Sequence, residues 1–407
     1  MRKQKLVLIL VMFIVAGNLF AQGGWTSQSS NVSIELFDVK FININTGFVV
    51  GDSGKVLRTT NSGVNWITQT IGTNKSFTSI SFIDANTGWI AGLDTIVYKT
   101  TDGGQSWIGL PNNYRLIYPD ITFTDAQTGY LYARAATSTL LKTTNGGVNW
   151  QTVSIPLQSI YAVRFINSQT GWMGGVVNSP APNPRFYTTT NGGTTWTLVG
   201  NYDVRKICFI NGQTGFTGST SEIHKTTNTG ANWSSTSIAL PMLNFDFIND
   251  QIGWGLGSSI YRTNNSGVNW ELEYTSSVYL NSIDFVNQSI GWAVGRNGTI
   301  LYTTTGGVSV TQISTNIAEQ YSLNQNYPNP FNPNTVILYQ LSVAGFTSLK
   351  VFDLLGKEVA TLVNEKQNAG SYAVDFNSAE FSLPSGIYFY TLSAGEFKET
   401  KKMVLVK

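Results

Sequence analysis

The sequence predicts an all-β protein, a seven-bladed β-propeller followed by a small Ig-like β-sandwich. Three observations support this fold class. A turn-and-tryptophan box such as TTNGGVNW (143–150) recurs along the chain, a second motif such as FINSQTGW (165–172) recurs in step with it, and the composition changes near residue 321. Seven copies of a unit of about 40 residues are typical of a propeller with four-stranded blades.

The composition supports a turn-rich β protein. Of the 407 residues, 12% are charged and 13% aromatic, and 40 are glycine, which argues against a helical or disordered chain. Without Arg2, Lys3 and Lys5, 22 basic residues face 23 acidic ones, so no basic stripe points to nucleic acid. A single cysteine, Cys208, and a single histidine, His224, exclude a disulfide framework and an ordinary zinc site. We therefore expect no metal and no cofactor.

The first 21 residues are typical of a signal peptide. They combine a basic start, an apolar segment over 6–15 and a cleavage position after Ala21. An uncleaved anchor is the alternative. No later stretch is long and apolar enough to span a bilayer, so we expect an exported protein without a transmembrane span after cleavage.

Each box is expected to form the hairpin between the third and fourth strands of a blade. Full boxes begin at Thr59, Thr100, Thr143, Thr189, Thr226 and Thr263. The Asn or Asp at the third position can accept backbone N–H bonds, the Gly supplies a positive φ, and the Trp opens the outer strand and packs between blades. In the first blade the predicted strands are 38–42, 48–51, 55–60 and one starting at 66. The tryptophans with this structural role are Trp66, Trp107, Trp150, Trp196, Trp233 and Trp270.

The seventh box, TTTGGVSV (303–310), has Val310 where the others have tryptophan, while the mature chain begins GGWTSQ (23–28). The missing and the extra tryptophan match. We therefore predict that Trp25 lies in the outer strand of the seventh blade and closes the ring. The alternative is that Trp25 caps the first blade. On this interpretation the propeller covers 22–311, a linker covers 312–320 and the sandwich covers 321–407.

The repeats resemble two known groups of propellers. The boxes are similar to the Asp-box repeats of bacterial sialidases, and their pairing with NTGW turns looks more like the photosystem II assembly and stability factor family. The resemblance covers roughly residues 24–311. It implies a propeller in which the box is a structural hairpin remote from any active site.

The tail resembles the C-terminal sorting domain of the type IX secretion system. Its matching features are NYPNPFNP, FDLLGKEV, SGIYFY and a lysine-rich last strand ending at Lys407. This resemblance implies export through outer-membrane secretion machinery that recognises 321–407, and a secreted or surface-anchored protein. A carbohydrate-binding or Ig-like accessory module is the alternative.

Little in the sequence points to catalysis. With one histidine there is no nucleophilic triad, and the motif that opens a sialidase propeller is missing. Asp246 and Asp284 occupy equivalent positions in the first strands of adjacent blades, and such a pair could serve a glycoside hydrolase or lyase. Lys40 and Arg164 occupy the same position in other blades, so charge balance in a polar channel is the alternative.

Binding candidates gather on one face. The loops that vary between repeats emerge on the side opposite the boxes, and exposed Tyr and Arg on such loops are typical anchors. The candidates are Tyr114, Arg115, Tyr118, Arg134, Arg185, Tyr202 and Asp203. Loops that bind nothing are the alternative. The sequence therefore favours a module that binds or scaffolds a protein or glycan, with a polysaccharide-active enzyme as the alternative, and it leaves the question of catalysis open.

A basic residue precedes the box in five repeats, at Arg58, Lys99, Lys142, Lys225 and Arg262. A ring of such cations could dock an anionic partner. Alternatively, each side chain covers the edge of a blade with its aliphatic stem.

Overall fold

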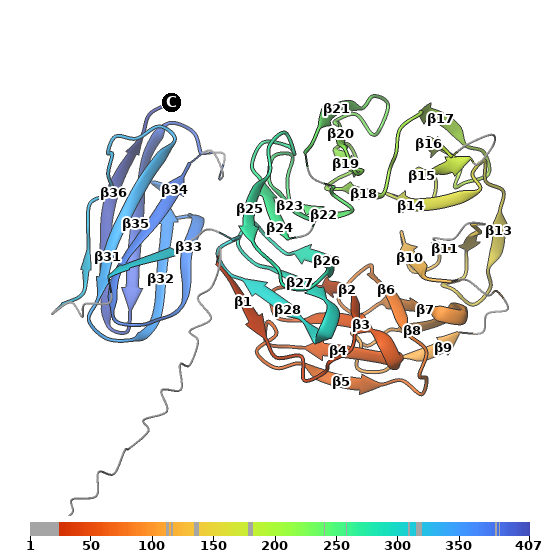
Figure 1. The fold of residues 1–407 in the computed structure, drawn as a ribbon, viewed down its shortest axis with the longest axis horizontal. Coiled ribbons are helices and arrows are strands. Elements are labelled where there is room, and N and C mark those ends of the chain that lie inside the picture. Colours follow the sequence, from red (N-terminus) through yellow and green to blue (C-terminus); the bar gives the residue numbers. More distant parts are fainter. Residues whose placement is uncertain are drawn as a thin grey trace, which may run out of the picture.

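The computed structural model describes residues 24–110, 114, 117–133, 138–177, 182–239, 241–257, 259–307, 310–314, 320–378, 381 and 383–407. Its strands form nine four-stranded sheets. Seven follow one another around a central axis, and the other two lie beside this ring (Figure 1). The expected all-β, propeller-like architecture is therefore confirmed. We number the ring sheets 1 to 7 in chain order.

In each ring sheet the first strand lies next to the axis and the fourth on the outside (Figure 1). Sheet 1 contains β2 (Leu36–Phe41), β3 (Gly47–Gly51), β4 (Lys55–Thr59) and β5 (Ile67–Thr70). Sheet 2 contains β6 (Phe77–Phe82), β7 (Gly88–Gly92), β8 (Ile96–Thr100) and β9 (Ile108–Leu110). Sheet 3 contains β10 (Pro119–Phe123), β11 (Gly129–Ala133), β12 (Leu140–Thr143) and β13 (Gln151–Val153).

The pattern continues around the ring. Sheet 4 contains β14 (Ser159–Phe165), β15 (Gly171–Val177), β16 (Asn183–Thr189) and β17 (Thr197–Gly200). Sheet 5 contains β18 (Lys206–Phe209), β19 (Gly215–Gly218), β20 (Glu222–Thr226) and β21 (Ser234–Ser237). Sheet 6 contains β22 (Asn244–Phe247), β23 (Gly253–Leu256), β24 (Ile260–Thr263) and β25 (Glu271–Tyr274). Short 3-10 turns, η1 (Asp52–Gly54), η2 (Leu93–Thr95) and η3 (Arg296–Gly298), join the second and third strands of sheets 1, 2 and 7.

Sheet 7 is completed by the start of the described chain. It contains β26 (Leu280–Phe285), β27 (Gly291–Gly295), β28 (Ile300–Thr303) and, as its outer strand, β1 (Trp25–Gln28). β1 is antiparallel to β28, with Trp25 opposite Thr303 and Gln28 opposite Ile300. The predicted closure of the ring through Trp25 is confirmed.

A three-ring aromatic stack joins each sheet to its neighbour. In sheet 1, Phe41 stacks on Trp292 of sheet 7 with ring centroids 3.3 Å apart, and the box tryptophan Trp66 meets Phe41 edge-on at 5.8 Å. The same pair of contacts recurs at the phenylalanine that ends the first strand of every ring sheet. At Phe285 the edge-on ring is Trp25, also at 5.8 Å. Trp25 therefore replaces the tryptophan that the seventh box lacks.

The box hairpin is fixed by two side chains. Asn61 accepts from the backbone N–H of Asn65 at 3.0 Å, as expected for the third position, and Gly63 has a positive φ of 82°. The buried Thr59 hydroxyl also accepts from the Gly63 N–H at 2.9 Å and lies 3.0 Å from Asn61 Oδ1. This threonine is a structural residue of the box that its sequence pattern did not reveal.

The basic residues before the boxes cover aromatic rings. Lys99 Nζ lies 5.0 Å from the centre of the Trp89 ring, and Lys142 Nζ lies 5.6 Å from that of Tyr130. Lys142 also donates to the Gly192 carbonyl in the next sheet at 3.0 Å. Arg58, Lys225 and Arg262 lie over rings in the same way. These contacts favour the structural interpretation of the basic residues.

The remaining two sheets share one hydrophobic core and contain the C-terminal strands. One has the order β29 (Val310–Ser314), β34 (Gly370–Asn377), β31 (Asn334–Leu341), β30 (Ser322–Leu323). The other has the order β33 (Glu358–Gln367), β32 (Gly345–Phe352), β35 (Gly386–Ala394), β36 (Phe397–Leu405).

The start of the expected linker needs a correction. β29 pairs with β34, with Val310 opposite Val374, so 310–314 belong to a strand of the C-terminal sheets; the expected propeller end at 311 and the expected linker start at 312 are both wrong. The physical reason is that β1 already fills the outer position of sheet 7, which leaves the segment after the seventh box to pair elsewhere. Among the described residues, no helix is long and apolar enough to cross a membrane.

Candidate functional site

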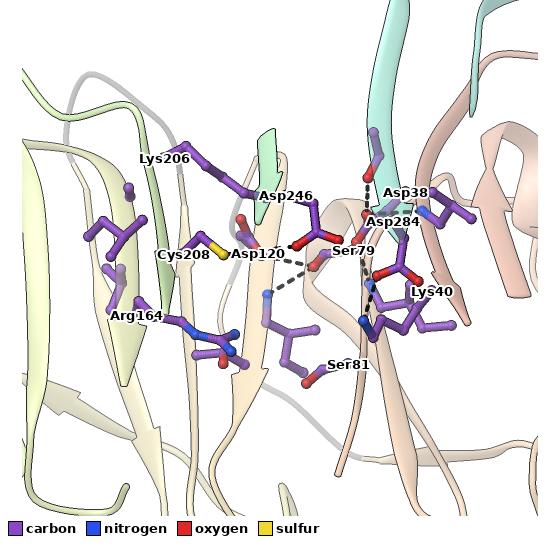
Figure 2. A pocket seen from close by; sticks show the side chains of 18 of the residues that line it. Asp38, Lys40, Ser79, Ser81, Asp120, Arg164, Lys206, Cys208, Asp246 and Asp284 are labelled. Carbon is purple, nitrogen blue, oxygen red and sulfur yellow. Dashed lines mark hydrogen bonds and ion pairs between the residues drawn. The ribbon is translucent and has the colours of Figure 1, made fainter. Parts of the chain in front are cut away.

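A polar hollow of about 250 Å³ lies on the axis of the ring (Figure 2). We call it the channel. In each first strand the terminal phenylalanine packs between sheets, so the residues one and three positions before it face the axis, because side chains alternate along a strand. The lining residues that this alternation supplies include Asp38, Lys40, Ser79, Ser81, Asp120, Thr122, Arg164, Lys206, Cys208, Asp246, Ser282 and Asp284.

Three channel carboxylates hold the first strands of adjacent sheets together. Asp284 Oδ2 accepts from the Phe41 backbone N–H at 2.7 Å, Asp246 Oδ2 from that of Phe285 at 2.8 Å, and Asp38 Oδ2 from that of Ile80 at 3.0 Å. A fourth carboxylate, Asp120, accepts from the hydroxyls of Ser79 and Tyr132, both at 2.8 Å. These acids therefore satisfy polar groups of the fold.

Burial and neighbouring charges shift the pKa values of the ionisable channel residues. Desolvation, followed by the charge of Asp284, raises the pKa of Asp246 to about 6. Desolvation also raises the pKa of Asp38, although the positive charge of Lys206 opposes the shift. Burial would lower the pKa of Lys40, but the negative charges of Asp284 and Asp246 outweigh it and raise that pKa. Lys40 Nζ lies 2.5 Å from Asp284 Oδ1. The expected proximity of Asp246 and Asp284 is thus observed, together with a counter-ion.

Two channel cations are not paired in this way. Within the described part of the chain, neither Arg164 nor Lys206 forms an ion pair or a side-chain hydrogen bond. Figure 2 shows both on one side of the channel, with Lys40 and Asp284 on the other. Arg164 is exposed and Lys206 half-buried. Cys208 lies in the same region, and burial, followed by the charge of Asp246, raises the pKa of its thiol to about 11.

The channel opens toward the face that carries the variable loops. In four sheets the first strand has a register shift near its start, between Leu36 and Asp38, Phe77 and Ser79, Ile160 and Ala162, and Leu280 and Ser282. Such β-bulges redirect side chains. The four inserted residues, Phe37, Thr78, Tyr161 and Asn281, line two hollows at this opening, which we call the mouth.

The two mouth hollows differ in character. The first, of about 210 Å³, is lined by Phe37, Tyr118, Asp120, Lys206 and Asn281 among others. The second, of about 360 Å³, contains Tyr161, Arg205, Leu243, Asn244 and Tyr279 in its wall, and we call it the tyrosine pocket. Asn244 and Asn281 line both hollows.

Of the predicted binding residues, Tyr118 lies at the mouth, where it is 52% exposed and meets Phe37 edge-on. Tyr114 instead packs against a core cluster that contains Trp89 and Trp150, and its hydroxyl lies 3.4 Å from the Trp150 carbonyl. Arg115 and Arg134 lie outside the described residues.

The other predicted binding residues have internal partners. Arg185, on β16, donates to Asn183 Oδ1 and to the Pro184 carbonyl. The Tyr202 ring stacks on His224 with centroids 4.0 Å apart. Asp203 pairs with Arg205, with Nε 2.8 Å from Oδ2, and so supports a residue of the tyrosine pocket.

Sequence reasoning missed most of the mouth. Tyr161, Arg205, Leu243 and Tyr279 lie on or next to first strands, which the sequence marks only as buried or alternating segments. The available signal for Tyr161, Arg205 and Leu243 was the position four before the strand-ending phenylalanine, whereas Tyr279 lies six positions before Phe285 and has no such signal. No group of three or more His, Cys, Asp or Glu side chains that could hold a metal is found among the described residues.

These features define a β-propeller with a polar axial channel and a separate C-terminal β-sandwich. Residues 18–117 match the family of photosynthesis system II assembly factor YCF48, and residues 325–407 match the secretion system C-terminal sorting domain. The resemblance of the repeats to the assembly-factor family and that of the tail to the sorting domain are thereby confirmed. The sorting domain indicates a protein that is secreted or displayed on the outer-membrane surface. A search of curated proteins gave no match.

Solved structures agree with this fold. A structure titled "YCF48 bound to D1 peptide" is 21% identical, with a TM-score of 0.56, over 69% of this chain and 97% of that one. YCF48 from Cyanidioschyzon merolae is 20% identical, with a TM-score of 0.56, over 69% and 98%. The GH74 enzyme of Niastella koreensis is 12% identical, with a TM-score of 0.56, over 94% and 75%. At these identities the likeness shows the fold alone.

Proposed function

We propose that this protein is an exported seven-bladed propeller that binds a carboxylate-bearing segment of another protein at the mouth of its channel. Residues 1–21 direct export as a signal peptide, and an Ig-like sandwich formed by 321–407 together with β29 engages the secretion machinery. The partner segment lies across the variable-loop face, with Tyr118 among its contacts. The observation that carries this proposal is the pair of channel cations, Arg164 and Lys206.

The charge arrangement supports an anionic partner. Asp38, Asp120, Asp246 and Asp284 are already committed to hydrogen bonds within the fold, and Lys40 is neutralised by Asp284. Arg164 and Lys206 are therefore the channel cations without a direct ion pair or side-chain hydrogen bond among the described residues, although the charge of Lys206 acts at longer range on Asp38 and Asp246. A guanidinium can bind a carboxylate through two parallel hydrogen bonds. The similar propeller YCF48 has been solved bound to a D1 peptide, which agrees with a protein partner for this chain.

A peptide panel tests the proposal. Twelve-residue peptides with Asp or Glu at one position, and matched peptides with Asn or Gln there, are titrated against the full mature chain by biolayer interferometry. We expect binding of acidic peptides and a loss of at least about tenfold on Arg164→Gln or Lys206→Gln, the loss of one charge-assisted contact. Lys75→Gln, on a variable-face loop and paired with Asp94, is the charge-matched control. If no acidic peptide binds, or if the channel variants bind like wild type, the proposal is wrong.

The alternative function is a glycoside hydrolase or lyase in the channel. It is favoured by the pKa of Asp246, about 6, because a general acid needs a raised pKa near the working pH. It would require Asp246→Asn or Asp284→Asn to abolish turnover of a polysaccharide. A screen of the mature chain against plant, algal and bacterial polysaccharides, with reducing-end release as the readout, separates the two functions.

A further inference from the structure

The tyrosine pocket is walled by side chains that are already held in place. The Arg205 guanidinium lies 3.8 Å from the centre of the Tyr161 ring, and Asp203 fixes that guanidinium from the other side. Arg296, which does not line the pocket itself, lies 5.6 Å from the centre of the Tyr279 ring and 3.3 Å from Glu35. Two tyrosines are thus each covered by an anchored arginine. A pocket whose walls are ordered before binding loses little side-chain entropy when a ligand enters.

The chemistry of the pocket suits a ring. Leu243 and Tyr279 are 40% and 50% exposed, and Leu256 and Leu280 form its buried floor. Large exposed apolar side chains around a pocket of about 360 Å³ are typical of a site that encloses one bulky apolar group. Aromatic faces and guanidinium planes both favour an aromatic occupant, through edge-on and stacked contacts.

The pocket also has one unused hydrogen-bond acceptor. The Asn244 amide nitrogen donates to the Asn281 carbonyl at 2.7 Å, while Asn244 Oδ1 is buried and receives no hydrogen bond from the described residues. This oxygen is buried in the free protein, so a donor reaches it only when the Asn244 side chain turns toward the pocket, and an occupant that brings a donor is then favoured. Tyrosine and tryptophan carry such a donor, and phenylalanine and leucine do not.

We propose that the tyrosine pocket binds one tyrosine or tryptophan side chain of the partner segment, while Lys206 and Arg164 hold the carboxylate of that segment in the adjoining channel. The identity of the partner rests on the proposed function. The pocket is continuous with the rest of the mouth through Asn244 and Asn281, which line both hollows. A partner segment that combines an acidic residue with a nearby tyrosine or tryptophan can therefore occupy both sites at once.

A small probe tests the pocket without a partner. Saturation-transfer NMR is recorded on the full mature chain with N-acetyl-tyrosinamide, and with the corresponding tryptophan, phenylalanine and leucine amides. We expect signal for tyrosine and tryptophan, weaker signal for phenylalanine and the weakest for leucine. Leu243→Trp, which fills the pocket, and Tyr279→Ala, which removes a wall, should abolish the tyrosine signal. Leu272→Trp is the matched control, because it is a 57% exposed leucine on the outer strand β25 of the same sheet.

The outcomes separate the two proposals. Equal signals for all four amides, or a tyrosine signal unchanged by Leu243→Trp, would overturn the pocket assignment. In acidic peptides that also contain a tyrosine, this aromatic anchor should contribute about 30-fold to affinity. If such peptides bind but replacing the tyrosine by alanine changes affinity less than about threefold, the pocket assignment fails and the channel site is unaffected. If the amide probe binds in the pocket but no acidic peptide binds, the proposed function fails alone.

Discussion

Lys40 and Asp284 form an ion pair of 2.5 Å across the seam where the last ring sheet meets the first, although they lie 244 positions apart. The same Asp284 accepts from the backbone of Phe41, next to Lys40. One carboxylate therefore ties β26 to β2 through a side chain and a main-chain group. The contacts of Asp284 therefore both place charges in the channel and help to close the ring.

Removing one partner of this pair should destabilise the ring. In Lys40→Met the Asp284 side chain, only 8% exposed, loses its counter-ion. Breaking a buried pair costs about 3–5 kcal/mol, and the 41% exposure of the Lys40 side chain reduces this to about 2 kcal/mol. Urea unfolding measures the free energy. The double variant Lys40→Met/Asp284→Asn should recover part of the lost unfolding free energy. If the double variant loses as much as the two single variants together, the two residues do not interact.

Asp246 should make stability depend on pH. Burial raises its pKa from the ordinary value of 3.8 to about 6 in the fold, so the native state holds this proton more tightly than the unfolded chain. The stability that protonated Asp246 adds to the fold is fully present below pH 3.8 and is lost as the pH rises through 6. Relative to wild type, Asp246→Asn should gain up to about 3 kcal/mol of unfolding free energy between pH 4 and pH 7. Urea unfolding at four pH values measures the difference.

Asp102 provides a control of opposite sign. Hydrogen bonds, first from the Ser106 hydroxyl, lower the pKa of this carboxyl to about 2. The stability that ionised Asp102 adds to the fold is present above pH 3.8 and is lost as the pH falls through 2. Asp102→Asn should therefore lose stability relative to wild type above pH 4, and a difference that grows with pH from 4 to 7 would contradict the assignment.

Trp25 should contribute as much to folding as a box tryptophan. It is 1% exposed and meets Phe285 edge-on, so Trp25→Ala leaves a cavity between sheets 6 and 7. The expected cost is about 3–5 kcal/mol of unfolding free energy, measured by urea denaturation. Thr26→Ala, in the same strand but exposed, is the control and should change little. Equal effects of the two substitutions would mean that the ring does not depend on this indole.

Lys142 should stabilise the junction of sheets 3 and 4 through its charge. Lys142→Met keeps the aliphatic stem but removes the ammonium from the Tyr130 ring and the Gly192 carbonyl. We expect a loss of about 1–2 kcal/mol, seen as a lower Tm in calorimetry. Lys55→Met, at the start of β4, is the matched control. If Lys142→Met is as stable as wild type, the stem alone covers the ring edge.

The repeat, the strand order within a sheet and the partner of the incomplete sheet could all be predicted from the amino-acid sequence. Each of these follows from local chemistry: the box needs its Asn and Gly for a tight turn, and a missing indole at Val310 is matched by an extra one at Trp25. Asp246 and Asp284 could be placed together because equivalent positions of a repeat lie side by side in a ring.

The role of those carboxylates and the position of the mouth depend on contacts between sheets and could not be predicted from the repeats. Their hydrogen bonds go to backbone groups of the neighbouring sheet, which no single repeat contains. The bulges that direct Phe37 and Tyr161 to the mouth depend on strand register, and register is a property of the paired strands. The path of 312–314 likewise depended on which strand had already filled sheet 7, because an occupied edge cannot pair again.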